Sequence, residues 1–135
     1  MATTTTIEFR NLPGTRAAIG RSGAHLVIAD RPEGKAGGMG LGFNGGELLA
    51  FAMGGCLAND LQALADEMGV VIADLRIEVA VDFDGTPSRA TGARVGVHCQ
   101  LADGSDPTGL VERARQLTTI GNSVRAGFPV EISGS

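Results

Sequence analysis

The sequence lacks the features that nucleic-acid-binding and membrane proteins need. It contains no tryptophan and no tyrosine, and its 11 basic residues are scattered among 15 acidic ones, for a formal net charge of −4. Nucleic-acid binding favours a concentrated positive surface and aromatic platforms, so no nucleic-acid partner is expected. The N-terminus has no basic region before an apolar core, and no run of about 18 apolar residues occurs. We therefore expect no membrane span, no secretory signal and a cytoplasmic protein.

Cysteine and histidine are also scarce. The chain has two cysteines, Cys56 and Cys99, and two histidines, His25 and His98. Two thiols cannot build a disulfide framework, and neither belongs to a C-x-x-C pair, so both are expected to be reduced. The same residues are too few for a zinc site. Neither a metal nor a bound cofactor is predicted.

The composition that is present is that of an ordinary globular domain. The 135 residues are 43% hydrophobic and 19% charged. A chain of this length can bury roughly two-thirds of its unfolded surface without a disulfide or a metal. We therefore expect one domain over residues 1–135.

The apolar spacing predicts an α+β protein. Alternating runs between turn residues indicate strands, and apolar residues three and four apart indicate a long helix that Gly69 ends. Hairpins and long helices without regular β–α–β alternation favour antiparallel sheets. The predicted order βββ–α–ββ–α–β comprises strands at 5–10, 16–20 and 24–29, a helix at 46–69, strands at 75–83 and 93–101, a helix from Asp106-Pro107 to about residue 120 with Leu110, Ala114 and Leu117 inward, and a strand at 128–132.

Glycines interrupt the predicted long helix at Gly54 and Gly55. A glycine inside a helix costs about 1 kcal/mol relative to alanine. Close packing of another element, such as a second copy of this helix, would explain the pair.

A second group of glycines spells G-x-G-x-x-G at residues 40–45 (GLGFNG). A dinucleotide fingerprint needs a strand that ends at the first glycine and an acidic residue at the end of the next strand. Here the preceding strand ends near Ala29, and the acidic residue twenty positions on, Asp60, lies inside the predicted helix. The pattern therefore indicates a loop in which glycine permits unusual backbone angles.

The segment GFNGGELL at residues 42–49, with Cys56 nine residues after Glu47, resembles the OsmC/Ohr family of osmotically inducible and organic hydroperoxide resistance proteins. Gly45 stands where the family's G-x-N-P-x-E-L-L pattern has proline. The order of the predicted elements also fits this family. The resemblance implies antiparallel sheets wrapped around central helices in an intertwined homodimer, with sites at the subunit interface.

The same resemblance implies peroxidase chemistry on a small-molecule substrate, with an external thiol as reductant. In the family, a first thiolate becomes a sulfenic acid, and a second cysteine condenses with it to a disulfide. Cys56 falls at the first position. Asn122, in Asn122-Ser123-Val124, stands where the family's C-x-V motif has the second. Cys99 lies on the buried face of a predicted strand, so we expect it in the core.

Asp60 is a further departure from the family pattern, because the family usually has a small or neutral residue there. It lies one helical turn after Cys56 on the same face. An ionised carboxylate would disfavour a neighbouring thiolate, whereas a protonated or proton-accepting Asp60 would not. An aspartate that points to solvent is the third possibility.

The family also uses an arginine and a glutamate to hold the thiolate. Glu47 matches the glutamate, although nine residues make 2.5 helical turns, which puts Glu47 and Cys56 on opposite sides of a regular helix. Glu47 is equally suited to stabilise the start of the helix. Arg16, Arg21 and Arg31 are candidate arginines, with Arg16 our choice, and no spacing distinguishes them.

Three functional hypotheses follow. The first is a peroxidase that reduces organic hydroperoxides through Cys56 and needs an external thiol. The second is an enzyme of other chemistry that uses Cys56 as nucleophile, Asp60 as acid or base and Asn122 as a polar anchor. The third is a dimer that binds a small apolar ligand without catalysis.

Overall fold

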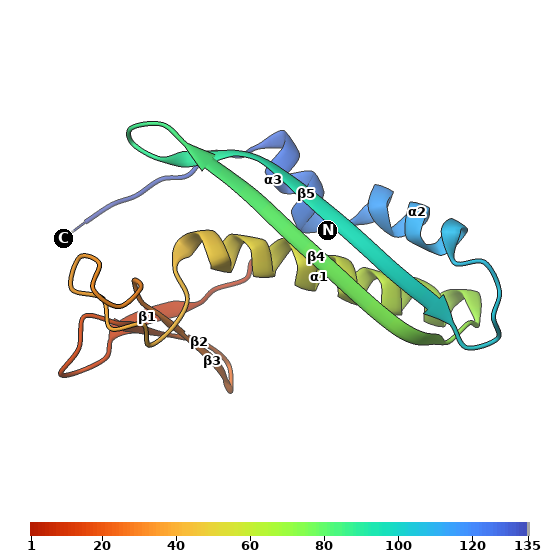
Figure 1. Ribbon diagram of the computed structural model, residues 1–135, viewed down its shortest axis with the longest axis horizontal. Coiled ribbons are helices and arrows are strands. Elements are labelled where there is room, and N and C mark those ends of the chain that lie inside the picture. The colour runs from red at the N-terminus through yellow and green to blue at the C-terminus, as the bar shows by residue number, and fades with distance from the viewer. Residues whose placement is uncertain (135) are drawn as a thin grey trace. The chain divides into compact units, whose positions relative to one another are not determined.

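The structure is a computed structural model, which describes residues 1–134 (Figure 1). The chain divides into two units, Met1–Leu48 and Leu49–Ser135, and each is described by itself. The elements are β1 (Glu8–Asn11), β2 (Ala18–Ser22), β3 (His25–Ala29), α1 (Gly45–Met68), β4 (Ile72–Asp84), β5 (Arg89–Leu101), α2 (Thr108–Leu117) and α3 (Thr119–Ala126).

The first unit contains the predicted antiparallel meander, in the order β1-β2-β3. Ser22 pairs with His25 across a tight turn, in which Gly23 has a φ of 59°. Glycine adopts such a positive φ without the steric cost that a side chain would add. At Gly20, a Cβ would lie 2.6 Å from ring carbons of Phe9, so the absence of a side chain lets this ring cover β2.

A buried carboxylate organises the glycine-rich loop that follows β3. The Asp30 side chain is 1% exposed. Its Oδ2 accepts hydrogen bonds from the backbone N–H groups of Met39 at 3.1 Å and Leu41 at 3.0 Å, and its Oδ1 accepts one from that of Arg31 at 2.8 Å. The loop is therefore folded around a single acceptor group.

Two glycines let this loop approach the chain before it. A Cβ on Gly38 would lie 2.5 Å from the carbonyl oxygens of Arg31 and Pro32, and one on Gly42 would overlap the carbonyl of Ile28. The neighbouring Phe43 N–H donates to that same Ile28 carbonyl at 2.9 Å. Within the G-x-G-x-x-G segment, Gly42 thus serves close backbone contact, and Gly40, with a φ of 66°, has the unusual backbone angle that the loop interpretation predicted.

The start of α1 has a reciprocal cap. Asn44 Oδ1 accepts from the Glu47 N–H at 2.8 Å, and Glu47 Oε1 accepts from the Asn44 N–H at 3.1 Å. This arrangement satisfies two amides that lack partners inside the helix. The helix ends before Gly69, whose φ is 69°, so both predicted ends of α1 are confirmed.

In the second unit, α1 lies along the β4–β5 hairpin, with α2 and α3 beside it (Figure 1). Alternate hairpin residues face the helices, and the others carry exposed pairs such as Arg94 with Asp82. The buried core cluster consists of Leu57, Leu61, Leu64 and Ala65 of α1, Leu101 of β5, and Leu110 and Ala114 of α2. The two long strands therefore supply one apolar face on which the helices pack.

The two helix glycines have different surroundings. A Cβ on Gly54 would lie 3.0 Å from Cγ2 of Val79 on β4, whereas one on Gly55 would meet nothing within 4 Å. Close packing at Gly54 is therefore explained by the chain's own hairpin. No contact within the described residues explains Gly55.

The C-terminal part corrects the sequence prediction in two places. The predicted single helix is broken at Thr118, whose ψ of 117° is not helical, so Leu110 and Ala114 are buried as predicted but Leu117 is exposed. The predicted strand at 128–132 is not a strand in the described residues. A strand needs a ladder partner, and β4 and β5 pair only with each other here.

Helix α1 is long and apolar enough, by length and composition alone, to cross a membrane. The core helix of a globular domain passes the same test. Four of its residues belong to the core cluster, whereas 28% of the helix's apolar window is buried within the described residues.

We expect Asp30→Asn to lower the stability of the protein at neutral pH. Hydrogen bonds lower the pKa of the Asp30 carboxyl against the opposing effect of burial. The largest effect comes from the N–H of Leu41, and the N–H groups of Met39 and Arg31 and the Arg31 guanidinium add to it. A lowered folded-state pKa contributes stability above the ordinary aspartate pKa and loses it as the pH falls through the folded value.

Thermal melting at neutral and acidic pH measures this effect. The melting temperature of the variant should lie several degrees below that of the wild type at neutral pH, and the gap should close in acid. A gap that is independent of pH would contradict the role of the charged carboxylate. Asp66→Asn, at an exposed carboxylate, is the matched control.

Candidate functional site

The Cys56 thiol lies at the middle of α1, at the border between the core and the surface. It is half-buried and immediately precedes the buried Leu57. Its Sγ donates to Oδ2 of Asp60, one helical turn later, at 3.7 Å. Cys56 and Asp60 are thus brought together as their spacing predicted, and Asp60 turns toward the sulfur.

Thr118 is a third member of this group that the sequence did not suggest. It is buried and occupies the break between α2 and α3. Its Oγ1 donates to Sγ of Cys56 at 3.7 Å across 62 positions of sequence. The sulfur therefore lies between a carboxylate that can accept its proton and a hydroxyl that can stabilise the thiolate. No local motif could have revealed a partner so distant in the chain.

Asn122 lies on α3, and its side chain bonds one residue of α2 and one of α3. Its amide Nδ2 donates to the carbonyl of Gln116 at 3.0 Å, and its Oδ1 accepts from Nη1 of Arg125 at 2.9 Å. Its backbone N–H donates to the carbonyl of Thr118 at 3.1 Å. Asn122 therefore contacts the backbone of Thr118, whose side chain contacts Cys56. The Asn122 side chain itself bonds Arg125.

Cys99 is half-buried on β5, opposite Leu75 on β4. It packs against the core cluster, in agreement with the predicted core position. Burial raises the pKa of the Cys99 thiol, and the Asp74 carboxylate raises it further. Cys99 is thus held in its neutral form, which is the less reactive one.

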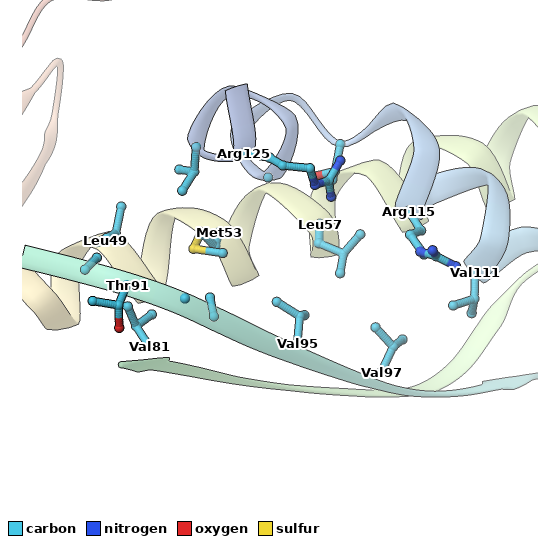
Figure 2. A pocket seen from close by; sticks show the side chains of 16 residues that line it. Leu49, Met53, Leu57, Val81, Thr91, Val95, Val97, Val111, Arg115 and Arg125 are labelled. Atoms are coloured by element: carbon cyan, nitrogen blue, oxygen red, sulfur yellow. The ribbon is translucent and has the colours of Figure 1, made fainter. Parts of the chain in front are cut away.

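An apolar groove of about 670 Å³ lies within the second unit, and its lining includes neither Cys56 nor Asp60. Figure 2 shows Met53 and Leu57 pointing from α1 toward β5, while Arg115 and Arg125 extend from α2 and α3. Thr118 both lines the groove and donates to Cys56. The lining consists of Leu49, Met53, Leu57, Val81, Ala90, Thr91, Gly92, Ala93, Val95, Val97, Val111, Arg115, Thr118, Gly121, Val124 and Arg125.

Glu47 and Arg16 belong to the first unit. Glu47 is engaged in the helix cap with Asn44. The Arg16 carbonyl accepts from Nη2 of Arg31 at 2.7 Å, and its guanidinium lies over Gly37, where a Cβ would be 2.6 Å from Nη1. Their participation in a site with Cys56 stays a prediction.

The side chains that metal ions prefer do not gather in the described part of the chain. Within residues 1–134, no three histidine, cysteine, aspartate or glutamate side chains form a cluster that could hold a metal ion.

We expect Cys99 to react slowly with thiol reagents at neutral pH. In a Cys56→Ser protein, Cys99 is the only thiol, and its alkylation by iodoacetamide can be followed from about pH 6 to pH 10. Because its pKa is raised, the midpoint of the rate should lie above that of free cysteine. A midpoint at or below the value for free cysteine would contradict the assignment to the core.

The comparisons with known proteins agree on one family. The family model described as OsmC-like protein matches residues 37–133. No match to this chain was found among curated proteins.

Solved structures show the same fold at low sequence identity. The chain is similar to an OsmC-like protein from Mycoplasma pneumoniae, with a TM-score of 0.75 and 14% identity over 93% of this chain and 89% of that one. It is similar to an organic hydroperoxide resistance protein OsmC from Legionella pneumophila, with a TM-score of 0.63 and 19% identity over 93% and 91%. An organic hydroperoxide resistance protein from Elizabethkingia anophelis gives a TM-score of 0.63 and 20% identity over 93% and 91%. With a family model that matches more than half of its length, this chain belongs to the OsmC-like protein family.

Proposed function

We propose that this chain is a cytoplasmic thiol peroxidase that reduces organic hydroperoxides at Cys56 and is recycled by an external thiol. The observation that carries the proposal is the placement of Cys56 Sγ between a proton acceptor, Asp60, and a hydrogen-bond donor, Thr118. Two of the similar structures described above are hydroperoxide resistance proteins, which supports the same chemistry.

In the first step, Asp60 Oδ2 accepts the proton of the Cys56 thiol. The thiolate attacks the terminal oxygen of the hydroperoxide, so an S–O bond forms and the O–O bond breaks. The leaving alkoxide takes the proton back from Asp60 and departs as an alcohol. Sulfur is oxidised to a sulfenic acid, and the peroxide is reduced.

In the second step, an external thiol attacks the sulfenic sulfur, which releases water and leaves a mixed disulfide. A second external thiol attacks this disulfide, regenerates the Cys56 thiol and leaves as an oxidised disulfide. We infer that an external reductant is required because the residue that faces the Cys56 sulfur is Thr118, and Asn122, which the resemblance matches to the family's second cysteine, carries no thiol either. The polar bonds of Asn122 to Gln116 and Arg125 support a structural role for that residue.

The wild-type protein should consume cumene hydroperoxide in the presence of dithiothreitol or lipoamide, and Cys56→Ser should abolish this turnover. Asp60→Asn should slow the oxidation of Cys56 by about a hundredfold or more, because it removes the proton acceptor. Single-turnover oxidation, with the sulfenic acid trapped by dimedone and located by mass spectrometry, measures the step directly.

Matched controls separate chemistry from folding in this assay. Cys99→Ser and Asp66→Asn should keep wild-type turnover, because neither side chain contacts the proposed nucleophile. Arg16→Met and Glu47→Gln test the two side chains that the family resemblance implies. Wild-type protein that gives neither peroxide loss nor a modified Cys56 would overturn the proposal and leave the two other hypotheses.

The same family resemblance leads us to propose a homodimer. Phe128, Val130 and Ile132 alternate along the extended tail and are 68%, 72% and 93% exposed. Alternation of this kind is typical of a strand with one buried face. Within the described residues, β4 and β5 have no strand neighbour other than each other, so a second copy offers the tail both an edge and an apolar face.

Replacing Val130 and Ile132 together by glutamate should weaken the dimer by at least about tenfold, because each change puts a charge into an apolar contact. Light scattering on a gel-filtration column, over a series of protein concentrations, measures the dissociation. Val71→Glu alters a comparably exposed apolar residue outside the tail and is the control. A wild-type protein that stays monomeric at all concentrations would contradict the assembly.

A further inference from the structure

Thr118 is the N-cap residue of α3, but its side chain does not cap that helix. In the described part of the chain it makes no side-chain cap hydrogen bond. A threonine at an N-cap ordinarily uses its side-chain oxygen to accept from a backbone N–H two or three residues later. Here Oγ1 donates to Sγ of Cys56 at 3.7 Å. The hydroxyl is therefore directed away from its local partner and onto a side chain of another helix.

The methyl group of Thr118 lies over Gly121, in the first turn of α3. A Cβ on Gly121 would be 2.9 Å from Cγ2 of Thr118, which is well inside the contact distance of two carbon atoms. Oγ1 and Cγ2 are both bonded to Cβ of Thr118, so they rotate together about χ1 and cannot move separately. The space over Gly121 that receives the methyl group therefore decides where the hydroxyl points.

The backbone at Gly121 does not itself require glycine. Gly121 lies inside a helix and has no positive φ, and alanine is the more favourable residue in a helix. Gly109 of α2 is a matched case, because it is also helical. A Cβ on Gly109 would meet nothing within 4 Å. What distinguishes Gly121 from Gly109 is thus the contact with the Thr118 methyl group.

We propose that Gly121 is a positioning residue for Cys56: it leaves room for the Thr118 methyl group and so keeps the Thr118 hydroxyl on the sulfur. Thr118 contacts the reacting atom directly, whereas Gly121 acts through Thr118. A hydroxyl that donates to the sulfur stabilises the thiolate relative to the thiol, and the thiolate is the reactive form. The inference rests on the proposed function only where the reaction partner is a hydroperoxide, since alkylation of the thiol depends on the same hydrogen bond.

The rate constant for alkylation of Cys56 by iodoacetamide at neutral pH tests the proposal in a Cys99→Ser protein, where Cys56 is the only thiol. Thr118→Val replaces the hydroxyl by a methyl group of similar size and should slow alkylation by about fivefold. Gly121→Ala should slow it by a similar factor, because the new Cβ displaces the Thr118 methyl group and turns the hydroxyl away from the sulfur. Gly109→Ala makes the same change without a contact and should leave the rate unchanged.

Two double variants separate positioning from a general disturbance of α3. In the Thr118→Val protein, Gly121→Ala should have no further effect, since no hydroxyl is left to be misplaced. In the Thr118→Ser protein, the methyl group that meets the new Cβ is absent, so Gly121→Ala should slow alkylation less than it does beside threonine. Equal slowing by Gly121→Ala whichever residue occupies position 118 would overturn the proposal. Faster alkylation of the single Gly121→Ala protein, as a loosened α3 would give, would also overturn it.

Single-turnover oxidation by cumene hydroperoxide extends the same variants to the proposed reaction, and their rates should fall in the same order. The expected alkylation pattern without any oxidation of Cys56 by hydroperoxide would overturn the proposed function and retain the role of Gly121. Hydroperoxide turnover with equal oxidation and alkylation rates in the wild type and in Gly121→Ala would overturn the role of Gly121 and retain the proposed function.

Discussion

The packing of α1 on one face of the β4–β5 hairpin is the constraint on which the rest of the second unit depends. Burial of Leu57, Leu61, Leu64 and Ala65 fixes the rotation of the helix about its axis, and full burial of one such leucine is worth about 1.5–3 kcal/mol. Once that rotation is fixed, the residue before Leu57 must lie at the margin of the core. Cys56 is half-buried for this reason, and Asp60, one turn later, is directed to the same margin.

The break between α2 and α3 places Thr118 against the Cys56 sulfur. A continuous helix through this region would keep Thr118 and Asn122 on one face, since they are four residues apart. The break instead lets Thr118 donate to Cys56 while α3 directs Asn122 and Arg125 to each other. One local change of backbone direction therefore connects the thiol to the groove.

Much of the fold was predictable because period, caps and turn residues are local signals. The meander, both ends of α1, the hairpin and the burial of Leu110 and Ala114 all follow from such signals. The break at Thr118 and the exposure of Leu117 could not be foreseen, because they depend on packing across the second unit. The pairing of Cys56 with Asp60 followed from helical spacing, whereas the Thr118 contact spans 62 positions and has no local signature.

Under the proposed chemistry, neither Thr118 nor Asn122 can resolve a sulfenic acid, so an external thiol must reach the Cys56 sulfur after the alcohol product has left. Two different molecules must therefore reach a half-buried sulfur in turn. Thr118 is the residue that both contacts this sulfur and lines the groove. The break between α2 and α3, which places Thr118 there, therefore sets how the reductant approaches Cys56 in the proposed cycle.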